Sequence, residues 1–131
     1  MKRVVLDTNA YSDYQRWGRW QWQIQRAGQV LMPVVVLAEL KYGFLSRESE
    51  PRNRLVLQRF LNERRVSVLL MTERTSDVYA DFKTQLKRQG TPIPENDIWI
   101  AALCYEAGGS LASADTHFRH LPQLSLAVES S

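Results

Sequence analysis

The stretch VVLDTN at positions 4–9 decides the fold. The residues from Arg3 to Leu6 form a short β-branched and aliphatic run, which is typical of a strand buried on both faces. The chain contains four further candidate strands, at Val30–Met32, Val66–Leu70, Ser110–Ser113 and, with the alternation of an edge strand, Leu124–Val128. We therefore expect five strands, and Asp7 follows the first of them directly.

The segments between these runs show helical periodicity. Val78, Phe82 and Leu86 recur at four-residue steps, in a segment that Thr72 opens as a predicted N-cap and Gly90 ends. Three more helices are expected, namely Val34–Leu45 after Pro33, one that begins near Pro51 and carries Leu57, Phe60 and Leu61 on one side, and Glu95–Ala107. Strands that alternate with helices imply a parallel sheet covered on both faces, whose ligands bind at the carboxyl ends of the strands.

The composition indicates one globular domain over residues 1–131. The 131 residues are 44% hydrophobic and 24% charged, and no repeat or linker divides them. The apolar runs are far shorter than the roughly 18 residues of a membrane-spanning helix, and the segment 1–7 lacks the pattern of a signal peptide. These features predict a cytoplasmic protein. A single cysteine, Cys104, excludes an internal disulfide and a cysteine-based zinc site.

The charge balance is modestly basic. Seventeen Lys and Arg residues against 14 Asp and Glu residues give a net charge of +3. Such an excess suits a polyanionic partner, although many basic proteins bind none. If four of the acids gather in one pocket, the remaining surface is more strongly basic. The sequence then predicts an acidic hollow within a basic surface.

Four acids stand out because of their surroundings. Asp7 and Asp115 each follow a predicted strand, so both fall at the carboxyl edge of the sheet. Glu39 interrupts an otherwise apolar helix, and Asp97 lies in the first turn of the last helix. Each acid also has an ordinary structural explanation. Asp7 can cap a helix, Glu39 can form a salt bridge, Asp97 can complement the helix dipole, and Asp115 can form a turn.

Convergence of these acids would require a positive counter-charge. Two carboxylates about 5 Å apart repel by about 3 kcal/mol at an effective dielectric constant of roughly 20. A divalent cation would supply the charge, and a set of oxygen ligands favours Mg²⁺ or Mn²⁺ over zinc. Such ions activate water and neutralise the charge that develops on a phosphodiester.

The motifs around these acids resemble a known family. The chain contains LDTN at 6–9, AEL at 38–40, ND at 96–97 followed by IAA at 100–102, and SAD at 113–115 followed by HF at 117–118. In this order and at these separations, they resemble the PIN-domain nucleases, and more narrowly the VapC-type ribonuclease toxins of bacterial toxin–antitoxin pairs. The resemblance extends from Val4 to Leu126.

The resemblance implies a structure and a function. It implies a three-layer α/β/α PIN-like fold with a central, mainly parallel sheet of about five strands, and a homodimer. It also implies Mg²⁺- or Mn²⁺-dependent cleavage of RNA, and an antitoxin protein that occupies the site. The positions that match the family's metal-site acids are Asp7, Glu39, Asp97 and Asp115, and those that match polar neighbours orienting the acids are Asn9 and Ser113.

Two basic segments suggest further binding surfaces. Arginines and tryptophans alternate in RWGRWQW at positions 16–22. We interpret Trp17, Trp20 and Trp22 as part of a partner groove, with core packing and RNA stacking as alternatives. A second group of arginines either tracks an RNA backbone or forms a solvated helix face, namely Arg52, Arg54, Arg59, Arg64 and Arg65.

Other mechanisms and functions compete with this hypothesis. In a metal-free ribonuclease, His117 and His120 would be the acid and the base, but local packing and exposure explain both residues. We therefore favour attack by water on the phosphodiester. This mechanism predicts products with 5′-phosphate and 3′-hydroxyl ends. A phosphate-accepting aspartate is a second alternative, which Asn9 disfavours because related phosphatases carry an acid there. A third is a non-catalytic PIN-like RNA-binding or scaffold protein, which the presence of all four acids disfavours.

Overall fold

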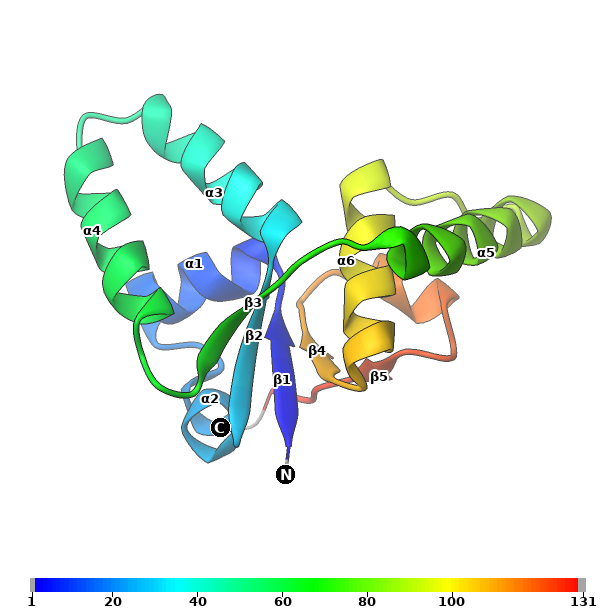
Figure 1. Ribbon diagram of the computed structural model, residues 1–131, viewed down its shortest axis with the longest axis horizontal. Coiled ribbons are helices and arrows are strands. Elements are labelled where there is room, and N and C mark those ends of the chain that lie inside the picture. The colour runs from blue at the N-terminus through cyan, green and yellow to red at the C-terminus, as the bar shows by residue number, and fades with distance from the viewer. Residues whose placement is uncertain (1, 130–131) are drawn as a thin grey trace.

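A parallel β-sheet forms the centre of the computed structural model, which describes residues 2–129 (Figure 1). The strands are β1 (Arg3–Leu6), β2 (Gln29–Pro33), β3 (Val66–Leu69), β4 (Ser110–Ala112) and β5 (Ser125–Leu126). Their order in the sheet is β3-β2-β1-β4-β5, and all four neighbouring pairs are parallel. The central strand is β1, so the residue that follows it lies in the middle of the sheet's carboxyl edge.

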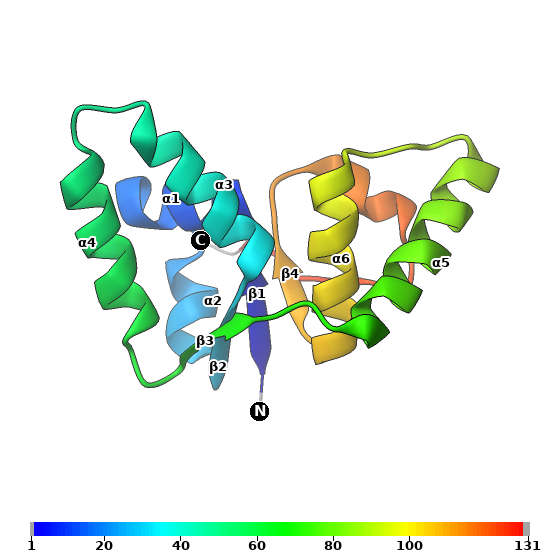
Figure 2. The same ribbon diagram turned by 45° about the horizontal axis from the view of Figure 1, so that its top comes forward.

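Helices connect the strands and pack on both sides of them. They are α1 (Thr8–Trp17), α2 (Gln21–Arg26), α3 (Val34–Leu45), α4 (Glu50–Leu61), α5 (Glu73–Gln89), α6 (Glu95–Ala107) and the 3₁₀ helix η1 (Thr116–His120). In two views 45° apart, α1, α3 and α4 lie on one side of the strands, and α5 and α6 lie on the other (Figures 1 and 2). This arrangement confirms the predicted α/β fold with a parallel sheet between helices.

The observed elements differ from the predicted ones mainly near the N-terminus. Helices α3, α5 and α6 have the predicted bounds, whereas β5 is shorter than the predicted Leu124–Val128 run. Helices α1 and α2 were not predicted, because the polar residues after Asp7 do not form an apolar stripe at helical spacing. Local signals for α1 are nevertheless present, since Asp7 caps its start and Gly18, in the left-handed conformation, ends it.

The hydrophobic core joins the strands to the helices on both sides. Val5, Leu6 and Val30 on β1 and β2 are fully buried, as are Ile100 of α6 and Phe118 of η1. Burial of such aliphatic and aromatic side chains stabilises the fold by roughly 1.5–3 kcal/mol each. The core therefore fixes the carboxyl ends of β1 and β4 and the start of α6 relative to one another.

Close packing also explains one glycine at the amino end of β4. A Cβ atom on Gly109 would lie 2.8 Å from Cγ2 of Val5, so any larger residue would push β4 away from β1. The buried thiol of Cys104 lies nearby, with Sγ 3.3 Å from the carbonyl oxygen of Gly109. Burial raises the pKa of this thiol to about 12, so the thiolate is not populated at neutral pH.

The described helices are too short or too polar to cross a membrane; among residues 2–129, none combines the necessary length and hydropathy.

Candidate active site

A cavity of about 440 Å³ opens at the carboxyl end of β1. Its lining comes from the start of α1, from α3, from the segment that leads into α6, and from the segment after β4. The lining residues are Asp7, Thr8, Asn9, Glu39, Pro94, Glu95, Asn96, Asp97 and Asp115. The structure thus brings together all four acids that the sequence singled out.

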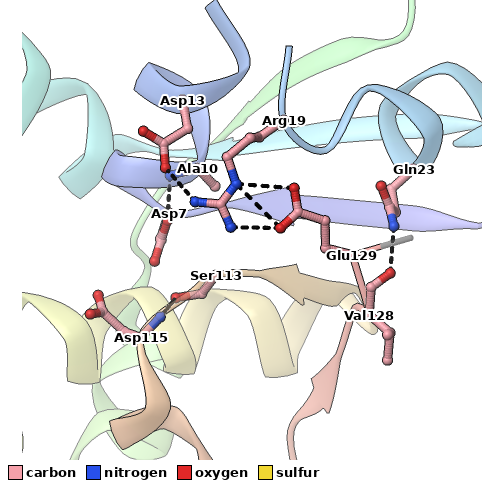
Figure 3. A network of polar contacts seen from close by, with 9 residues as sticks. All are labelled: Asp7, Ala10, Asp13, Arg19, Gln23, Ser113, Asp115, Val128 and Glu129. Carbon is pink, nitrogen blue, oxygen red and sulfur yellow. Dashed lines mark hydrogen bonds and ion pairs between the residues drawn. The ribbon is translucent and has the colours of Figure 1, made fainter. Parts of the chain in front are cut away.

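Asp7 is the most deeply buried of the four acids, with 3% of its surface exposed. It is the N-cap of α1, and its Oδ1 accepts a hydrogen bond from the backbone N–H of Ala10 at 2.8 Å (Figure 3). Burial raises the pKa of Asp7 to about 6, against the opposing effect of hydrogen bonds from Ser113 and Ala10, and Asp115 and Asp97 raise it further. Asp7 therefore caps a helix and also contributes negative charge to the cavity.

Glu39 is oriented by a hydroxyl group and not by a cation. Oγ1 of Thr8 donates a hydrogen bond to Oε1 of Glu39 at 2.6 Å. Within residues 2–129, no Arg or Lys forms a salt bridge with Glu39, so the ion pair considered from the sequence is not formed. Sequence reasoning missed the role of Thr8. The one signal for Thr8 in the sequence is its position directly after Asp7, the residue that follows β1.

Asp97 lies in the first turn of α6, as predicted, but it does not cap the helix. The N-cap is Pro94, and no side chain caps this end of α6. Oδ2 of Asp97 instead lies 2.8 Å from Nε2 of His117 in η1. Burial raises the pKa of Asp97, His117 lowers it, and the carboxylates of Glu39 and Asp115 raise it.

His117 therefore belongs to the site, which corrects the interpretation that packing and exposure alone explain it. One ligand atom from each of Asp97, Asp115 and His117 lies within 4.8 Å of the others. His120 is exposed and does not line the cavity, so the two histidines do not form an acid–base pair there. Sequence reasoning missed His117 because its position depends on the turn between β4 and η1.

Ser113 connects two of the acids at the end of β4. Its Oγ accepts a hydrogen bond from the backbone N–H of Asp115 at 3.0 Å, and its hydroxyl group also lowers the pKa of Asp7. Figure 3 shows Ser113 between these two residues. The orienting role that the family resemblance implies for Ser113 stays a prediction. Asn9, the other predicted neighbour, is exposed and lines the same cavity.

Glu95 also lines the cavity, but its carboxylate is bound to α5. It accepts hydrogen bonds from Lys83 and Tyr79, and the Lys83 interaction is the main reason that the pKa of Glu95 is lowered. The Tyr79 ring stacks on Trp99 of α6 with centroids 3.9 Å apart. These contacts join α5 to α6 beside the acidic cavity.

The three tryptophans of the predicted partner groove differ in burial. All three line a second cavity of about 430 Å³, together with Arg19 and Glu129. Trp17 and Trp22 are 70% and 44% exposed, whereas Trp20 is 4% exposed and belongs to the core. Figure 3 shows Arg19 between Asp13 and Glu129, where it joins the loop after α1 to the C-terminal segment.

Three of the five arginines from Arg52 to Arg65 have different surroundings. Arg65 lies 2.9 and 2.5 Å from the carbonyl oxygens of Ile24 and Ala27 and is thus a structural residue at the end of α2. Arg54 forms an ion pair with Glu50 one turn earlier in α4. Arg52 lines a different cavity, between α1 and α4.

Comparison with known proteins identifies related sequences. A family model described as the PIN domain matches residues 4–124. Ribonuclease VapC2 of Haemophilus influenzae is 35% identical over 89 residues, which are 68% of this chain and 66% of the relative, just under two thirds of its length. Ribonuclease VapC2 of Rickettsia felis is 28% identical over 93 residues, which are 70% of this chain and 68% of the relative.

Comparison of structures shows a similar fold over nearly the whole chain. The structure of VapBC2 from Rickettsia felis bound to a DNA fragment from their promoter contains a chain with a TM-score of 0.84 and 22% identity, covering 98% of this chain and 99% of that one. In VapBC-1 from nontypeable Haemophilus influenzae, the corresponding values are a TM-score of 0.85, 22% identity, and coverage of 95% and 96%.

Proposed function

This chain belongs to the PIN domain family, and we propose that it is a metal-dependent endoribonuclease, the toxin of a VapC-type toxin–antitoxin pair. The observation that carries the proposal is the cavity at the end of β1, where Asp7, Glu39, Asp97 and Asp115 meet. The relatives named ribonuclease support the RNA substrate.

The residues of the cavity fit a hard divalent cation. Asp97, Asp115 and His117 have ligand atoms close enough to share one ion, and Asp7 and Glu39 face the same space. Burial raises the pKa of Asp7, and within residues 2–129 no Arg or Lys forms a salt bridge with it, so a bound cation would stabilise its charged form. Oxygen ligands favour Mg²⁺ or Mn²⁺, and the imidazole of His117 is also compatible with Mn²⁺. When bound, either ion would activate water and neutralise charge on the phosphodiester.

The protein's own side chains hold the acids in place for this reaction. The N–H of Ala10 and the hydroxyl of Ser113 orient Asp7, and the hydroxyl of Thr8 orients Glu39. His117 lies against Asp97 and restricts its position. Such partners of metal ligands fix their geometry and support metal affinity. Hydrolysis by water at this site would leave 5′-phosphate and 3′-hydroxyl ends on the RNA.

The proposal extends to the partners of the protein. Solved structures of similar fold include VapBC complexes. We infer that this chain binds a cognate antitoxin, with the exposed rings of Trp17 and Trp22 as aromatic anchors at the interface. A homodimer and a cytoplasmic location belong to the same proposal.

The experiment that tests the function is cleavage of RNA by the purified protein in Mn²⁺, in Mg²⁺ and in excess EDTA. We expect cleavage with either metal and none in EDTA, and mass spectrometry should identify 5′-phosphate ends. Glu39→Gln should abolish cleavage while the protein remains folded. Equal cleavage in EDTA, or 2′,3′-cyclic phosphate products, would contradict the proposal.

A further inference from the structure

A cavity of about 500 Å³ between α1 and the α3–α4 hairpin contains three arginines. Arg16 comes from the end of α1, Arg47 from the turn between α3 and α4, and Arg52 from the first turns of α4. Tyr11, Phe44 and Val56 also line the cavity and provide apolar surface. This arginine cavity shares no lining residue with the acidic cavity.

The three guanidinium groups have no salt-bridge partner in the described part of the chain. Among residues 2–129, none of Arg16, Arg47 and Arg52 forms a salt bridge. By contrast, Arg19 and Arg54 both pair with carboxylates. Three like charges that line one hollow repel each other, so binding of an anion there is electrostatically favourable. The planar fork of a guanidinium group matches the oxygens of a phosphate.

The cavity also contains a buried polar group. Tyr11 is 3% exposed, and no described side chain gives its hydroxyl a well-formed hydrogen bond. Burial raises the pKa of this hydroxyl to about 12, although Gln15 lowers it in part, so the hydroxyl remains a hydrogen-bond donor at neutral pH. Tyr11 thus forms part of the cavity wall, and its hydroxyl oxygen lies beneath the accessible surface.

The arginine cavity adjoins the acidic cavity along one face of α1. Asn9, Ser12 and Arg16 follow each other at steps of three and four residues, so they share a face of the helix. Asn9 lines the acidic cavity, and Ser12 and Arg16 line the arginine cavity. Seven residues of α-helix span about 10 Å. Helices α1, α3 and α4 lie together in both views (Figures 1 and 2).

We propose that Arg16, Arg47 and Arg52 bind backbone phosphates of the RNA strand on one side of the bond that is cleaved. The proposal rests on the proposed function for the identity of the substrate. A cavity with four carboxylates repels a polyanion, so the substrate must be held by cations nearby. The arginine cavity provides these cations at a distance of a few nucleotides, and its apolar lining can contact a base.

An acidic protein segment is the other occupant that the charges would admit. Phosphates fit better because an extended RNA strand can continue from the arginines into the acidic cavity with its reactive phosphate. An acidic peptide that followed the same path would place its carboxylates against Asp7 and Glu39. Binding of RNA and of polyglutamate to the same variants separates these two occupants.

The test measures binding of a 20-nucleotide uridine homopolymer in EDTA, with the salt concentration varied. We compare wild type with the triple variant Arg16→Gln, Arg47→Gln, Arg52→Gln. The control is Arg74→Gln, Lys87→Gln, Arg88→Gln, which removes the same charge from exposed positions of α5. We expect the first variant to bind the RNA at least roughly tenfold more weakly than wild type. The slope of log affinity against log salt concentration should decrease in magnitude by about 2, because three phosphate contacts are lost. The RNA affinity of the control variant should stay within about threefold of that of wild type.

Several outcomes would overturn the proposal. Unchanged RNA affinity and salt dependence in the first variant would contradict it. Equal losses of RNA affinity in both triple variants would also contradict it, because they would indicate a response to net charge alone. Loss of binding to a 20-residue polyglutamate with retained RNA binding would assign the cavity to an acidic protein. The three single variants provide the same comparison if the triple variant does not fold. If the wild-type protein binds RNA through these arginines but does not cleave it, the proposed function is wrong and this inference still holds.

Discussion

Nε2 of His117 lies 2.8 Å from Oδ2 of Asp97, a contact that joins η1 to the first turn of α6. Asp97 therefore has a partner on another element, and it is not a residue that merely complements the dipole of its own helix. One ligand atom from each of His117, Asp97 and Asp115 lies within 4.8 Å of the others, a spacing that would let the three share one cation.

A first prediction follows for metal affinity. His117→Gln should weaken Mn²⁺ binding by roughly tenfold or more, because the residue is either a ligand or the partner that orients one. His120→Gln is the matched control, since His120 is exposed outside the cavity. Isothermal titration calorimetry on both variants measures the effect directly. Identical Mn²⁺ affinity in the two variants would remove His117 from the metal site.

The pKa of Asp7 leads to a second prediction, about stability in EDTA. Its pKa is about 6 in the folded protein and 3.8 in the unfolded chain, so the folded state favours the protonated acid. Below about pH 4, Asp7 is protonated in both states and does not lower the free energy of unfolding. Between about pH 4 and pH 6, its ionisation lowers the free energy of unfolding progressively. The full loss is about 3 kcal/mol.

Asp7→Asn isolates this contribution, because asparagine keeps the N-cap role while it cannot ionise. The unfolding free energy of the variant, measured with urea, should rise relative to wild type between pH 4 and pH 6. Mn²⁺ should reverse the difference at pH 7 by binding the wild-type carboxylate. A difference between the two proteins that does not change with pH would show that Asp7 titrates normally.

The sequence contained enough information to predict the strands and the place where the acids meet. Short apolar runs identify buried strands, and parallel strands bring their carboxyl ends to one edge whatever the details of the loops. Asp7 and Asp115 could therefore be placed from their positions after β1 and β4. Glu39 was recognisable because a carboxylate is unusual in an apolar helix.

The contacts that orient the acids could not be predicted in the same way. Thr8 meets Glu39 across 31 positions of sequence, and His117 reaches Asp97 through the path of a short 3₁₀ helix. Neither pairing produces a periodic pattern. The sequence also did not separate the three tryptophans, for which core packing was the alternative to a partner groove: Trp20 has a left-handed backbone conformation (φ 65°) and is buried, whereas Trp17 and Trp22 are exposed.

The difference among the tryptophans gives a third prediction. Trp17→Ala should leave the unfolding free energy nearly unchanged, whereas Trp20→Ala should lower it by about 3–5 kcal/mol because a buried side chain is lost. If the proposed antitoxin interface is correct, Trp17→Ala should weaken the complex by about 2 kcal/mol while RNA cleavage persists. Calorimetry of the complex and a cleavage assay measure the two effects. Lost cleavage with unchanged antitoxin affinity would instead place Trp17 in the RNA-binding surface.

Thr8 provides a fourth prediction, based on a conservative pair of variants. Thr8→Val keeps the shape of the side chain but removes the hydroxyl that donates to Glu39. We expect cleavage to fall by roughly tenfold or more, because an acid that is no longer oriented supports the metal poorly. Thr8→Ser retains the hydroxyl, so its rate of cleavage should stay close to that of wild type. Equal activity in the two variants would show that the contact has no role in the reaction.

The last prediction separates electrostatic repulsion from function at Asp97. Burial and the carboxylates of Glu39 and Asp115 raise the pKa of Asp97, so its charge is unfavourable in the metal-free protein. Asp97→Asn removes the charge and keeps the size and an acceptor oxygen for His117. Because Asp97 does not cap α6, the expected losses of stability are the weak interaction with the helix dipole, about 0.3–1 kcal/mol, and the charge-dependent part of the interaction with His117. Relief of repulsion opposes these losses.

Activity and stability should therefore respond differently to Asp97→Asn. In EDTA, the melting temperature of the variant should equal or exceed that of wild type. In Mn²⁺, wild type should gain thermal stability and the variant much less, and cleavage should fall by at least about a hundredfold as an anionic ligand is lost. Asp77→Asn, at an exposed position on α5, controls for the change of one charge. It should leave unchanged the melting temperature in EDTA, the stabilisation by Mn²⁺ and the rate of cleavage. Cleavage near the wild-type rate in Asp97→Asn would show that Asp97 is not a metal ligand, and the donor set would then reduce to the acids at the ends of β1 and β4 and on α3.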